Sequence, residues 1–293
     1  MTTSATAARG AAQILAVLAF AALAPGPAAA ATFLPDFGAA TFTPGAAISN
    51  PFFTLSPGYS LSLTAKGEDQ GTPFTETTIR SYAGAGRTLL GVGTQTMLDQ
   101  AYVNGVLVEE TRDYFAQDTA GNVWYMGEDV TNYLYDENGN LTGTSSSSSW
   151  LAGANGALPG FQMPAAPSVG LSFFQEFAGA DNALDEALVI ATDATVVSGG
   201  RTYTNVLAMF ESTALDPSLR EIKYYAPGIG LIRADEGVDL EYKHPSLVFS
   251  ITEGDPAPVP LPAGLQLLAA ALAGLALIRR RLTGNGAALR PAT

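Results

Sequence analysis

Residues 96–111 read TMLDQAYVNGVLVEET, two strand-like runs separated by Asn104-Gly105. Asn and Gly both tolerate the positive φ angles that the two central residues of a type I′ turn require, and this turn joins the strands of tight hairpins. The stretch therefore predicts two antiparallel strands, 96–103 and 106–111, with a two-residue turn between them.

The same construction recurs along the chain. Residues 114–117 and 123–126 flank the turn sequence DTAGN, and another turn is centred on DENGN at 136–140. EIKYY (221–225) and GLIR (230–233) flank Pro227-Gly228, which favours a type II turn. Further strands are expected at 59–64, 189–197 and 201–210. Consecutive hairpins bury one face, so we expect a mainly β protein with a single antiparallel, curved or barrel-like sheet.

Three stretches interrupt this pattern. Residues 153–169 are rich in Gly, Ala and Pro, and they predict a long ordered loop because such residues cannot hold a central strand. Residues 181–188 predict one short helix. The serine run 145–149 before Trp150 predicts a loop or an exposed edge.

Charge is concentrated between the two ends of the chain. Five of the 14 basic residues lie in the terminal segments, while all 27 acidic residues lie between Ala31 and Pro256, which leaves the middle with a formal charge of about −18. Such an excess repels phosphate backbones, so nucleic acid is not an expected partner. The chain has no cysteine, which excludes disulfides, thiolate metal sites and a thiol nucleophile.

The N-terminus has the three parts of a secretion signal. Arg9 precedes an apolar run over residues 11–24, and Pro25-Gly26-Pro27 ends that run before four alanines. Small residues fit the pocket of signal peptidase, so we expect cleavage after Ala30 or Ala31. Residues 1–31 are therefore interpreted as a signal peptide, the alternative being an anchor that stays attached.

A second hydrophobic segment occupies residues 256–293. It contains VPLPAG, then an apolar run to Ile278, then a basic cluster; the residues concerned are Val259, Pro260, Leu261, Pro262, Ala263, Gly264, Arg279, Arg280 and Arg281. A helix over residues 259–278, rising about 1.5 Å per residue, would span about 30 Å, the thickness of a bilayer core. Arginines favour the cytoplasmic side. This predicts a precursor tethered in the inner membrane, with residues 32–255 forming one exported β domain.

This tail closely resembles the VPLPA-CTERM class of PEP-CTERM-like sorting signals. The resemblance implies processing by an exosortase, a transpeptidase-like membrane enzyme of Gram-negative bacteria that make extracellular polysaccharide. The mature protein would then reach the cell surface or the extracellular space without its hydrophobic tail, as with a GPI signal. The alternative is an ordinary C-terminal anchor that is retained.

Several pieces of the middle region are similar to a group of exported bacterial proteins. They include NPFF at 50–53, YFAQD at 114–118, GNVWY at 121–125 and KYYAPGIGL at 223–231. The resemblance extends from about Ser49 to Ala234 and implies a single domain, but no activity.

Catalytic and metal-binding patterns are weak. The only histidine, His244, follows the apparent end of the domain, which argues against a Ser-His-Asp hydrolase, and one His without Cys makes a zinc site unfavourable. Calcium takes oxygen ligands, and the weak candidates are Asp118, Asn122, Asp136, Asn138 and Asn140. These residues are also common in hairpin turns, so we predict no metal site and no cofactor. Calcium-dependent adhesion is an alternative, in which a chelator would lower the melting temperature.

Two further sets of residues offer a site. Glu128-Asp129, and Asp235-Glu236 with Asp239 and Glu241, are carboxylate pairs of the type that glycosidases use, although an acidic chain forms such pairs by chance. Trp124, Tyr125 and Trp150 could form a ligand face, because aromatic rings stack on sugars. Trp124 and Tyr125 are adjacent in a strand and point to opposite faces, so at most one lines such a site, and Trp124 is expected in the core.

These observations predict an exported cell-surface or matrix protein with a non-enzymatic binding or structural role. Its ligand would be extracellular polysaccharide or a small apolar molecule within the curved sheet. The alternative is a carboxylate-dependent glycan hydrolase, which requires a cleft with two opposed acids.

Overall fold

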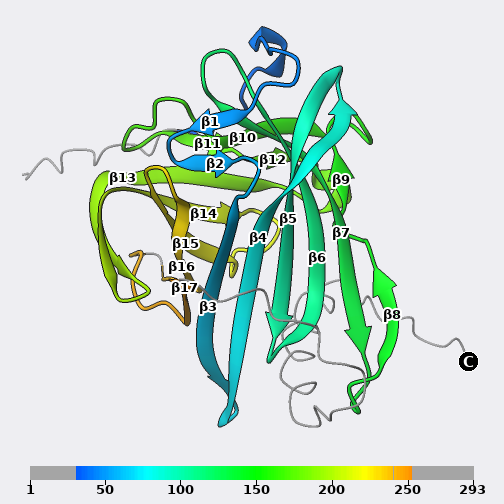
Figure 1. The fold of residues 1–293 in the computed structure, drawn as a ribbon, viewed down its shortest axis with the longest axis vertical. Helices are drawn as coiled ribbons and strands as arrows, with labels where there is room; N and C mark the ends of the chain where they lie inside the picture. Colours follow the sequence, from blue (N-terminus) through cyan, green and yellow to red (C-terminus); the bar gives the residue numbers. More distant parts are fainter. Residues whose placement is uncertain (1–30, 240, 253–293) are drawn as a thin grey trace, which may run out of the picture.

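The computed structural model describes residues 31–239 and 241–252, whose regular structure is almost entirely antiparallel β (Figure 1). The strands are β1 (Ile48–Asn50), β2 (Phe53–Leu55), β3 (Ser60–Asp69), β4 (Thr72–Leu89), β5 (Val92–Val103), β6 (Val106–Gln117), β7 (Val123–Tyr135), β8 (Leu141–Ser145), β9 (Trp150–Leu151), β10 (Leu158–Met163), β11 (Ser172–Phe174), β12 (Glu176–Phe177), β13 (Asp185–Ser198), β14 (Arg201–Thr213), β15 (Arg220–Ala226), β16 (Gly230–Glu236) and β17 (Leu247–Thr252). Two short 3-10 helices, η1 (Phe37–Ala39) and η2 (Gly179–Asp181), complete the described elements.

One sheet contains all of these strands except the β1–β2 hairpin. Its main path runs β11-β13-β14-β15-β16-β17-β3-β4-β5-β6-β7-β10-β12, with β8 and β9 pairing to β7. The two ends of this path, β11 and β12, are separated only by Gln175, whose backbone N–H donates to the Asp185 carbonyl at 2.8 Å. The segment 172–177 thus pairs first with β13 and then with β10, which nearly closes the sheet. The prediction of a mainly β, antiparallel, barrel-like fold is confirmed.

The hairpins form where the turn sequences predicted them. Asn104 and Gly105 have φ of 51° and 80°, as a type I′ turn requires. Gly228, with φ of 75°, takes the left-handed position of the predicted type II turn between β15 and β16. Local turn chemistry therefore sets the register of both pairs of strands.

Three expectations were wrong. Residues 153–169 contain β10, because Gly160 lets this strand pass close to its neighbour: a Cβ there would lie 2.0 Å from the Phe174 carbonyl oxygen. Residues 181–188 form no α-helix, since β13 begins at Asp185 and pairs on both sides with β11 and β14, which overrides local propensity. His244 does not follow the end of the domain, because β17 comes after it and pairs with β16 and β3.

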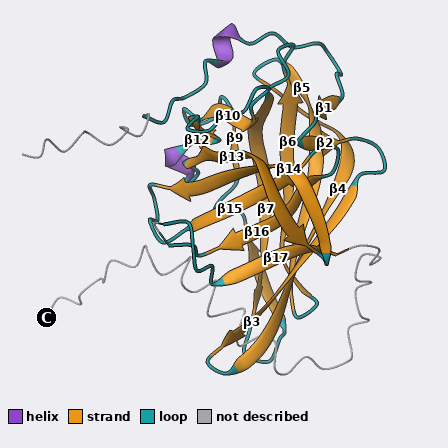
Figure 2. Cartoon of the chain, turned by 90° about the vertical axis from the view of Figure 1, so that its left-hand side faces the viewer, coloured by secondary structure: helices purple, strands orange, loops and turns teal. Residues whose placement is uncertain are grey.

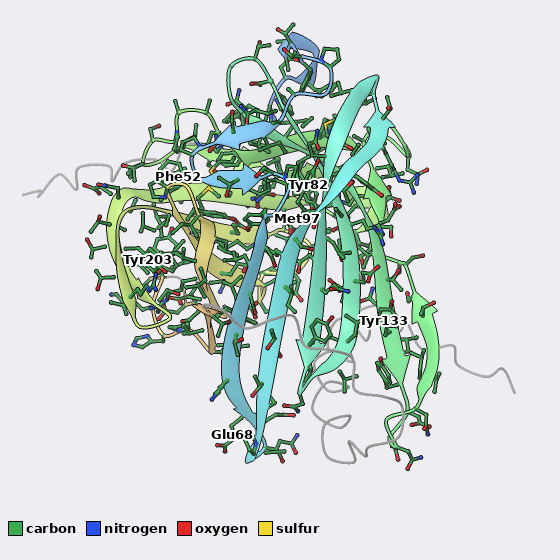
Figure 3. All side chains as sticks on the ribbon, in the orientation of Figure 1. Phe52, Glu68, Tyr82, Met97, Tyr133 and Tyr203 are labelled. Atoms are coloured by element: carbon green, nitrogen blue, oxygen red, sulfur yellow. The ribbon has the colours of Figure 1, made fainter. Side chains whose placement is uncertain are left out.

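The long strands β3–β7 form one wall, and β13–β16 cross them to form another (Figures 1 and 2). Most of the apolar core lies between these walls and includes Leu63, Phe115, Met209 and Ile232, each 2% exposed or less. Glu68 marks the far tip of the β3–β4 hairpin, whereas Tyr82 and Met97 lie near the middle of the wall (Figure 3).

The predicted signal peptide, the VPLPAG motif and the arginine cluster lie outside the described residues. Within the part that is described, no helix has the length and hydropathy to cross a bilayer.

Candidate functional site

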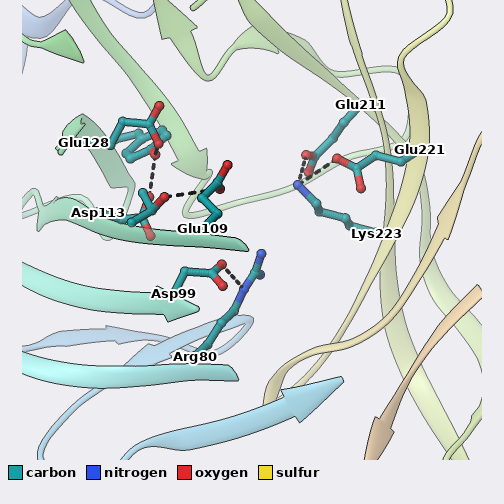
Figure 4. Close-up of polar contacts among 10 residues, drawn as sticks. Arg80, Asp99, Glu109, Asp113, Glu128, Glu211, Glu221 and Lys223 are labelled. Atoms are coloured by element: carbon teal, nitrogen blue, oxygen red, sulfur yellow. Dashed lines mark hydrogen bonds and ion pairs between the residues drawn. The ribbon is translucent and has the colours of Figure 1, made fainter. Parts of the chain in front are cut away.

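Charged side chains from both walls point toward one another inside the sheet (Figure 4). We call this group the inner cluster; it consists of Arg80, Asp99, Glu109, Asp113, Glu128, Glu176, Glu211, Glu221 and Lys223. Strand register places its members on one face, because Arg80 pairs with Asp99 and Asp113 pairs with Glu128. On the other wall, Glu211 pairs with Glu221. Directly opposed residues in antiparallel strands share a face, so these side chains converge.

A β-bulge in β7 brings Tyr125 and Glu128 to the same face. Phe115 pairs with Tyr125 and Tyr114 with Gly127, so Met126 is the extra residue. Without the extra residue, side chains three positions apart would face opposite sides of the sheet. Gly127 makes the bulge possible, because it has φ of 134° and a Cβ there would lie 2.6 Å from the Trp150 carbonyl oxygen.

The Tyr125 hydroxyl joins two carboxyl groups. Its oxygen lies 2.6 Å from Asp113 Oδ1 and 2.8 Å from Glu128 Oε2. A phenolic hydroxyl has one proton and can donate only one hydrogen bond. The other contact is a hydrogen bond only if that carboxyl group is itself protonated and donates to the tyrosine oxygen. This arrangement therefore favours a proton on Asp113 or Glu128.

The electrostatic surroundings favour that proton. Burial, followed by the negative charge of Asp99, raises the pKa of Asp113 from 3.8 to about 7. Burial and then the charge of Asp113 raise the pKa of Glu128 well above its usual value, and burial with the charge of Glu128 does the same for Glu176. Because the carboxyl groups influence one another, their protons belong to the cluster as a whole.

Two basic residues form ion pairs with three of the other carboxylates. Arg80 Nε lies 2.8 Å from Asp99 Oδ2, and Lys223 Nζ lies 2.6 Å from Glu211 Oε2 and 3.0 Å from Glu221 Oε1. The Arg80, Asp99 and Lys223 side chains are about one-fifth exposed, whereas Asp113 is only 6% exposed. Arg80, Asp99 and Lys223 thus lie nearer the solvent, whereas the Asp113 and Glu211 carboxyl groups lie deeper.

Trp150 contributes an unpartnered donor to the same face. It pairs with Glu128 across β9 and β7, and its ring packs edge-on against Tyr125 with 5.4 Å between centroids. The side chain is buried, yet Nε1 has no hydrogen-bond partner in the described part of the chain. A buried donor without an acceptor costs about 1–3 kcal/mol, so this nitrogen favours any acceptor that can reach it.

The predicted ligand face is divided between two environments. Trp124 lies in the core against Phe37 and Phe161, and its Nε1 donates to Asp118 Oδ2 at 2.8 Å. Tyr125 and Trp150 lie on the inner face, as described above. All three side chains are buried, so none of them presents an exposed ring to solvent.

The calcium candidates serve the turns in which they lie. The Asp118 carboxylate accepts from the backbone and side-chain N–H groups of Asn122. Asp136 accepts from the backbone N–H groups of Asn138 and Asn140, and also from the Asn140 side chain. In the described residues no group of three or more metal-ligating side chains is arranged to hold a metal ion.

The predicted acid pairs separate in the fold. Asp129 lies on the opposite face from Glu128, where Arg87 and Tyr114 bind it at 2.6 and 2.5 Å. Asp235 is held by Arg233, while Asp239 binds the exposed His244 at 2.8 Å. Glu241 is exposed and pairs with Lys243. Of these acids, only Glu128 joins the inner cluster.

Sequence reasoning did not identify Asp113, Glu176, Glu211, Arg80 or Lys223 as site residues. The available signal was in β6, where charged residues occupy both faces of the strand: Glu109 and Asp113 on one, Glu110 and Arg112 on the other. In a nearly closed sheet one of these faces must point inward. Charged side chains on an inner face need counter-charges, protons or a bound ligand.

The two tryptophans give a direct test of these environments. Trp124→Phe removes the donor to Asp118 and should destabilise the protein by about 1–3 kcal/mol. Trp150→Phe also leaves a smaller ring in a buried site but removes an N–H that has no partner, so we expect its loss to be smaller than that of Trp124→Phe by about 1 kcal/mol or more. Thermal unfolding of the two variants would measure the difference, and an equal or larger loss for Trp150→Phe would contradict the assignment of an unpartnered indole.

Comparisons with known proteins leave the activity open. No protein-family model matches the chain, and no curated protein matches it. One similar solved structure is a "putative exported protein with YmcC-like fold" from Bacteroides fragilis NCTC 9343, with 15% identity, a TM-score of 0.29, and coverage of 69% of this chain and 98% of the other. Another is a "putative lipoprotein" from Parabacteroides distasonis ATCC 8503, with 9% identity, a TM-score of 0.32, and coverage of 70% and 99%. At these scores we take no functional inference from either structure.

Proposed function

We propose that this chain is an exported, non-enzymatic protein of the cell surface or extracellular matrix that binds a saccharide through the inner cluster. The observation that carries the proposal is the arrangement of Asp113, Tyr125 and Glu128 beside the unpartnered Trp150 indole. Carboxyl groups and an N–H donor suit a ligand with many hydroxyl groups, because a hydroxyl can both donate and accept hydrogen bonds. The proposal assigns Tyr125 and Trp150, but not Trp124, to the ligand face.

Delivery in this proposal rests on the two ends of the sequence. Signal peptidase would cut after Ala30 or Ala31, and an exosortase-type enzyme would process the tail at the VPLPAG motif of residues 259–264. A tagged chain followed in strains with and without the exosortase tests this step. Unchanged processing and location in the deficient strain would defeat the sorting proposal.

Hydrolysis is the competing function, and the spacing of two carboxyl groups permits it. The Asp113 and Glu128 oxygens that contact Tyr125 can lie no more than about 5.4 Å apart, similar to the carboxyl separation in retaining glycosidases. However, the two acids are side by side on adjacent strands, and the Tyr125 hydroxyl occupies the space between them. A glycosidic bond has no place between these carboxyl groups in this arrangement, so binding is the better-supported function.

Glycan-array binding of the full chain in detergent tests the proposal. A glycan that the array identifies should bind at least about 10-fold more weakly to Glu128→Gln, which loses one charged hydrogen bond. Asp129→Asn is the matched control, since the adjacent carboxylate lies on the opposite face, and it should bind like the unmodified chain.

Two results would overturn the proposal. One is the absence of any retained glycan, and the other is equal binding by Glu128→Gln and the unmodified chain. Release of reducing ends from a retained glycan, lost in Glu128→Gln, would instead establish the hydrolase.

A further inference from the structure

We propose that the saccharide bound by the inner cluster carries a free amine, and that its ammonium group replaces the proton held by Asp113, Tyr125 and Glu128. This inference rests on the proposed function and specifies the class of ligand. It follows from the charge balance of the cluster, from the number of protons available, and from the Trp150 indole.

The charge balance favours a cation. The inner cluster contains seven carboxyl groups and two basic residues, and Arg80 and Lys223 form ion pairs with Asp99, Glu211 and Glu221 (Figure 4). None of the ion pairs that Arg80 and Lys223 form in the described residues involves Asp113, Glu128 or Glu176. A buried carboxylate without a counter-charge is unfavourable, so these groups must bind either protons or a cation.

The strands around Asp113 place further negative charge near it, which increases the need for a bound proton or cation. The groups that act on Asp113 are Asp99 of β5, Tyr125 and Glu128 of β7, Arg80 of β4, Glu109 of β6 itself and Glu176 of β12. Asp185 of β13 and Lys223 of β15 act in turn on Glu176, so most of the charged groups around the site are acidic. The proton that Asp113 and Glu128 share is the smallest cation that can satisfy them. A ligand cation of fitting geometry can take its place.

An ammonium group fits the spacing better than a metal ion does. The Tyr125 hydroxyl separates the two carboxyl oxygens by its contacts of 2.6 and 2.8 Å, and the described residues form no metal-ligating group of three. An ammonium group has three N–H donors, so it can donate to both carboxyl groups from the side that the Tyr125 hydroxyl does not fill. It therefore matches acceptors that a small metal ion could not coordinate together.

Trp150 is the independent observation that indicates a ligand, and it calls for a hydrogen-bond acceptor near the amine, which an amino sugar supplies. Its Nε1 is a buried donor without an acceptor, on the same face as Glu128. An ammonium group cannot accept this hydrogen bond, whereas a hydroxyl or ring oxygen can. In an amino sugar the amine and an oxygen acceptor lie on neighbouring carbons, so one ring can satisfy both the carboxyl groups and the indole.

Binding by this route releases a proton. The protonated carboxyl group loses its proton to solvent, and the resulting carboxylate pairs with the incoming ammonium group. No covalent bond within the sugar forms or breaks, and charge balances because one cation replaces another.

Calorimetry of the full chain in detergent at pH 6 tests the inference. The probes are the β-1,4-linked tetramer of glucosamine and its fully N-acetylated counterpart, each titrated in two buffers with different ionisation enthalpies. We expect the amine form to bind at least 10-fold more tightly, with release of about one proton per site. Asp113→Asn, with its fold verified by circular dichroism, should abolish the release, whereas Asp129→Asn should retain it.

The outcomes separate the two proposals. Equal binding of both tetramers, or binding of the amine form without proton release, overturns the inference but leaves saccharide binding intact. If neither tetramer binds while the array identifies a neutral glycan, the inference alone fails. If neither tetramer nor any glycan on the array binds, both proposals fail.

Discussion

Asp113→Asn should make the protein more stable at pH 8, by about 2 kcal/mol or more. The pKa of Asp113 is raised from 3.8 to about 7, chiefly by burial, so at pH 8 the folded protein must hold a buried carboxylate that the unfolded chain exposes to water. The amide has nearly the same shape and no charge. Its N–H can donate to the Tyr125 oxygen, which leaves the tyrosine proton for Glu128.

The pH dependence of this effect follows from the raised pKa. Protonation of Asp113 stabilises the folded protein fully below the unfolded value of 3.8, and this contribution is lost as the pH rises through about 7. The melting temperature of the unmodified chain should therefore be higher at pH 5 than at pH 8, and the difference should be smaller in Asp113→Asn. Asp129→Asn serves as the control and should keep the pH dependence of the unmodified chain. If Asp113→Asn is less stable than the unmodified chain at pH 8, the explanation is refuted.

Gly127→Ala should destabilise the protein by roughly 2–4 kcal/mol and lower the melting temperature by roughly 5–15 °C. Gly127 has φ of 134°, and an added Cβ would lie 2.6 Å from the Trp150 carbonyl oxygen and 2.8 Å from Leu151 Cα. Both contacts are to backbone, which cannot rotate away. The bulge at Met126 would have to rearrange, and with it the placement of Glu128 beside Tyr125.

Gly143→Ala is the matched control for this change. Gly143 lies in β8, which also pairs with β7, and a Cβ there meets no atom within 4 Å. We expect its melting temperature to change by less than about 2 °C, because the extra methyl group points into open space. Equal losses from both substitutions would show that β7 does not depend on the bulge.

Turn chemistry made much of the fold predictable. The conformations of the Asn104-Gly105 and Pro227-Gly228 turns depend on the residues within each turn. The hairpins could therefore be inferred without any knowledge of distant residues. The strand β10 could not be inferred in this way. Gly160 appears there because Phe174 approaches its backbone closely, and that contact joins residues whose proximity the closure of the sheet creates.

The site was less predictable for a related reason. Tyr125, Glu128 and Trp150 stood out by residue type, but their partner Asp113 did not, since it is one acid among the 27 of the chain. The bulge at Met126 also changes the alternation that assigns residues to faces, so a strict period of two misplaces Glu128 relative to Tyr125. The pairing of distant strands and the bulge at Met126 together determine which side chains meet in the inner cluster.

Infrared difference spectroscopy of the carboxylic C=O stretch, recorded on the full chain between pH 5 and pH 9, would test directly whether the cluster holds a proton. We expect a protonated carboxyl band at pH 6 that loses intensity as the pH passes about 7 and is weaker in the Asp113→Asn/Glu128→Gln double variant, in which Glu176 remains. A spectrum in which every carboxyl group is already ionised at pH 6 would contradict the shared proton at Tyr125, and with it the ligand exchange derived from it.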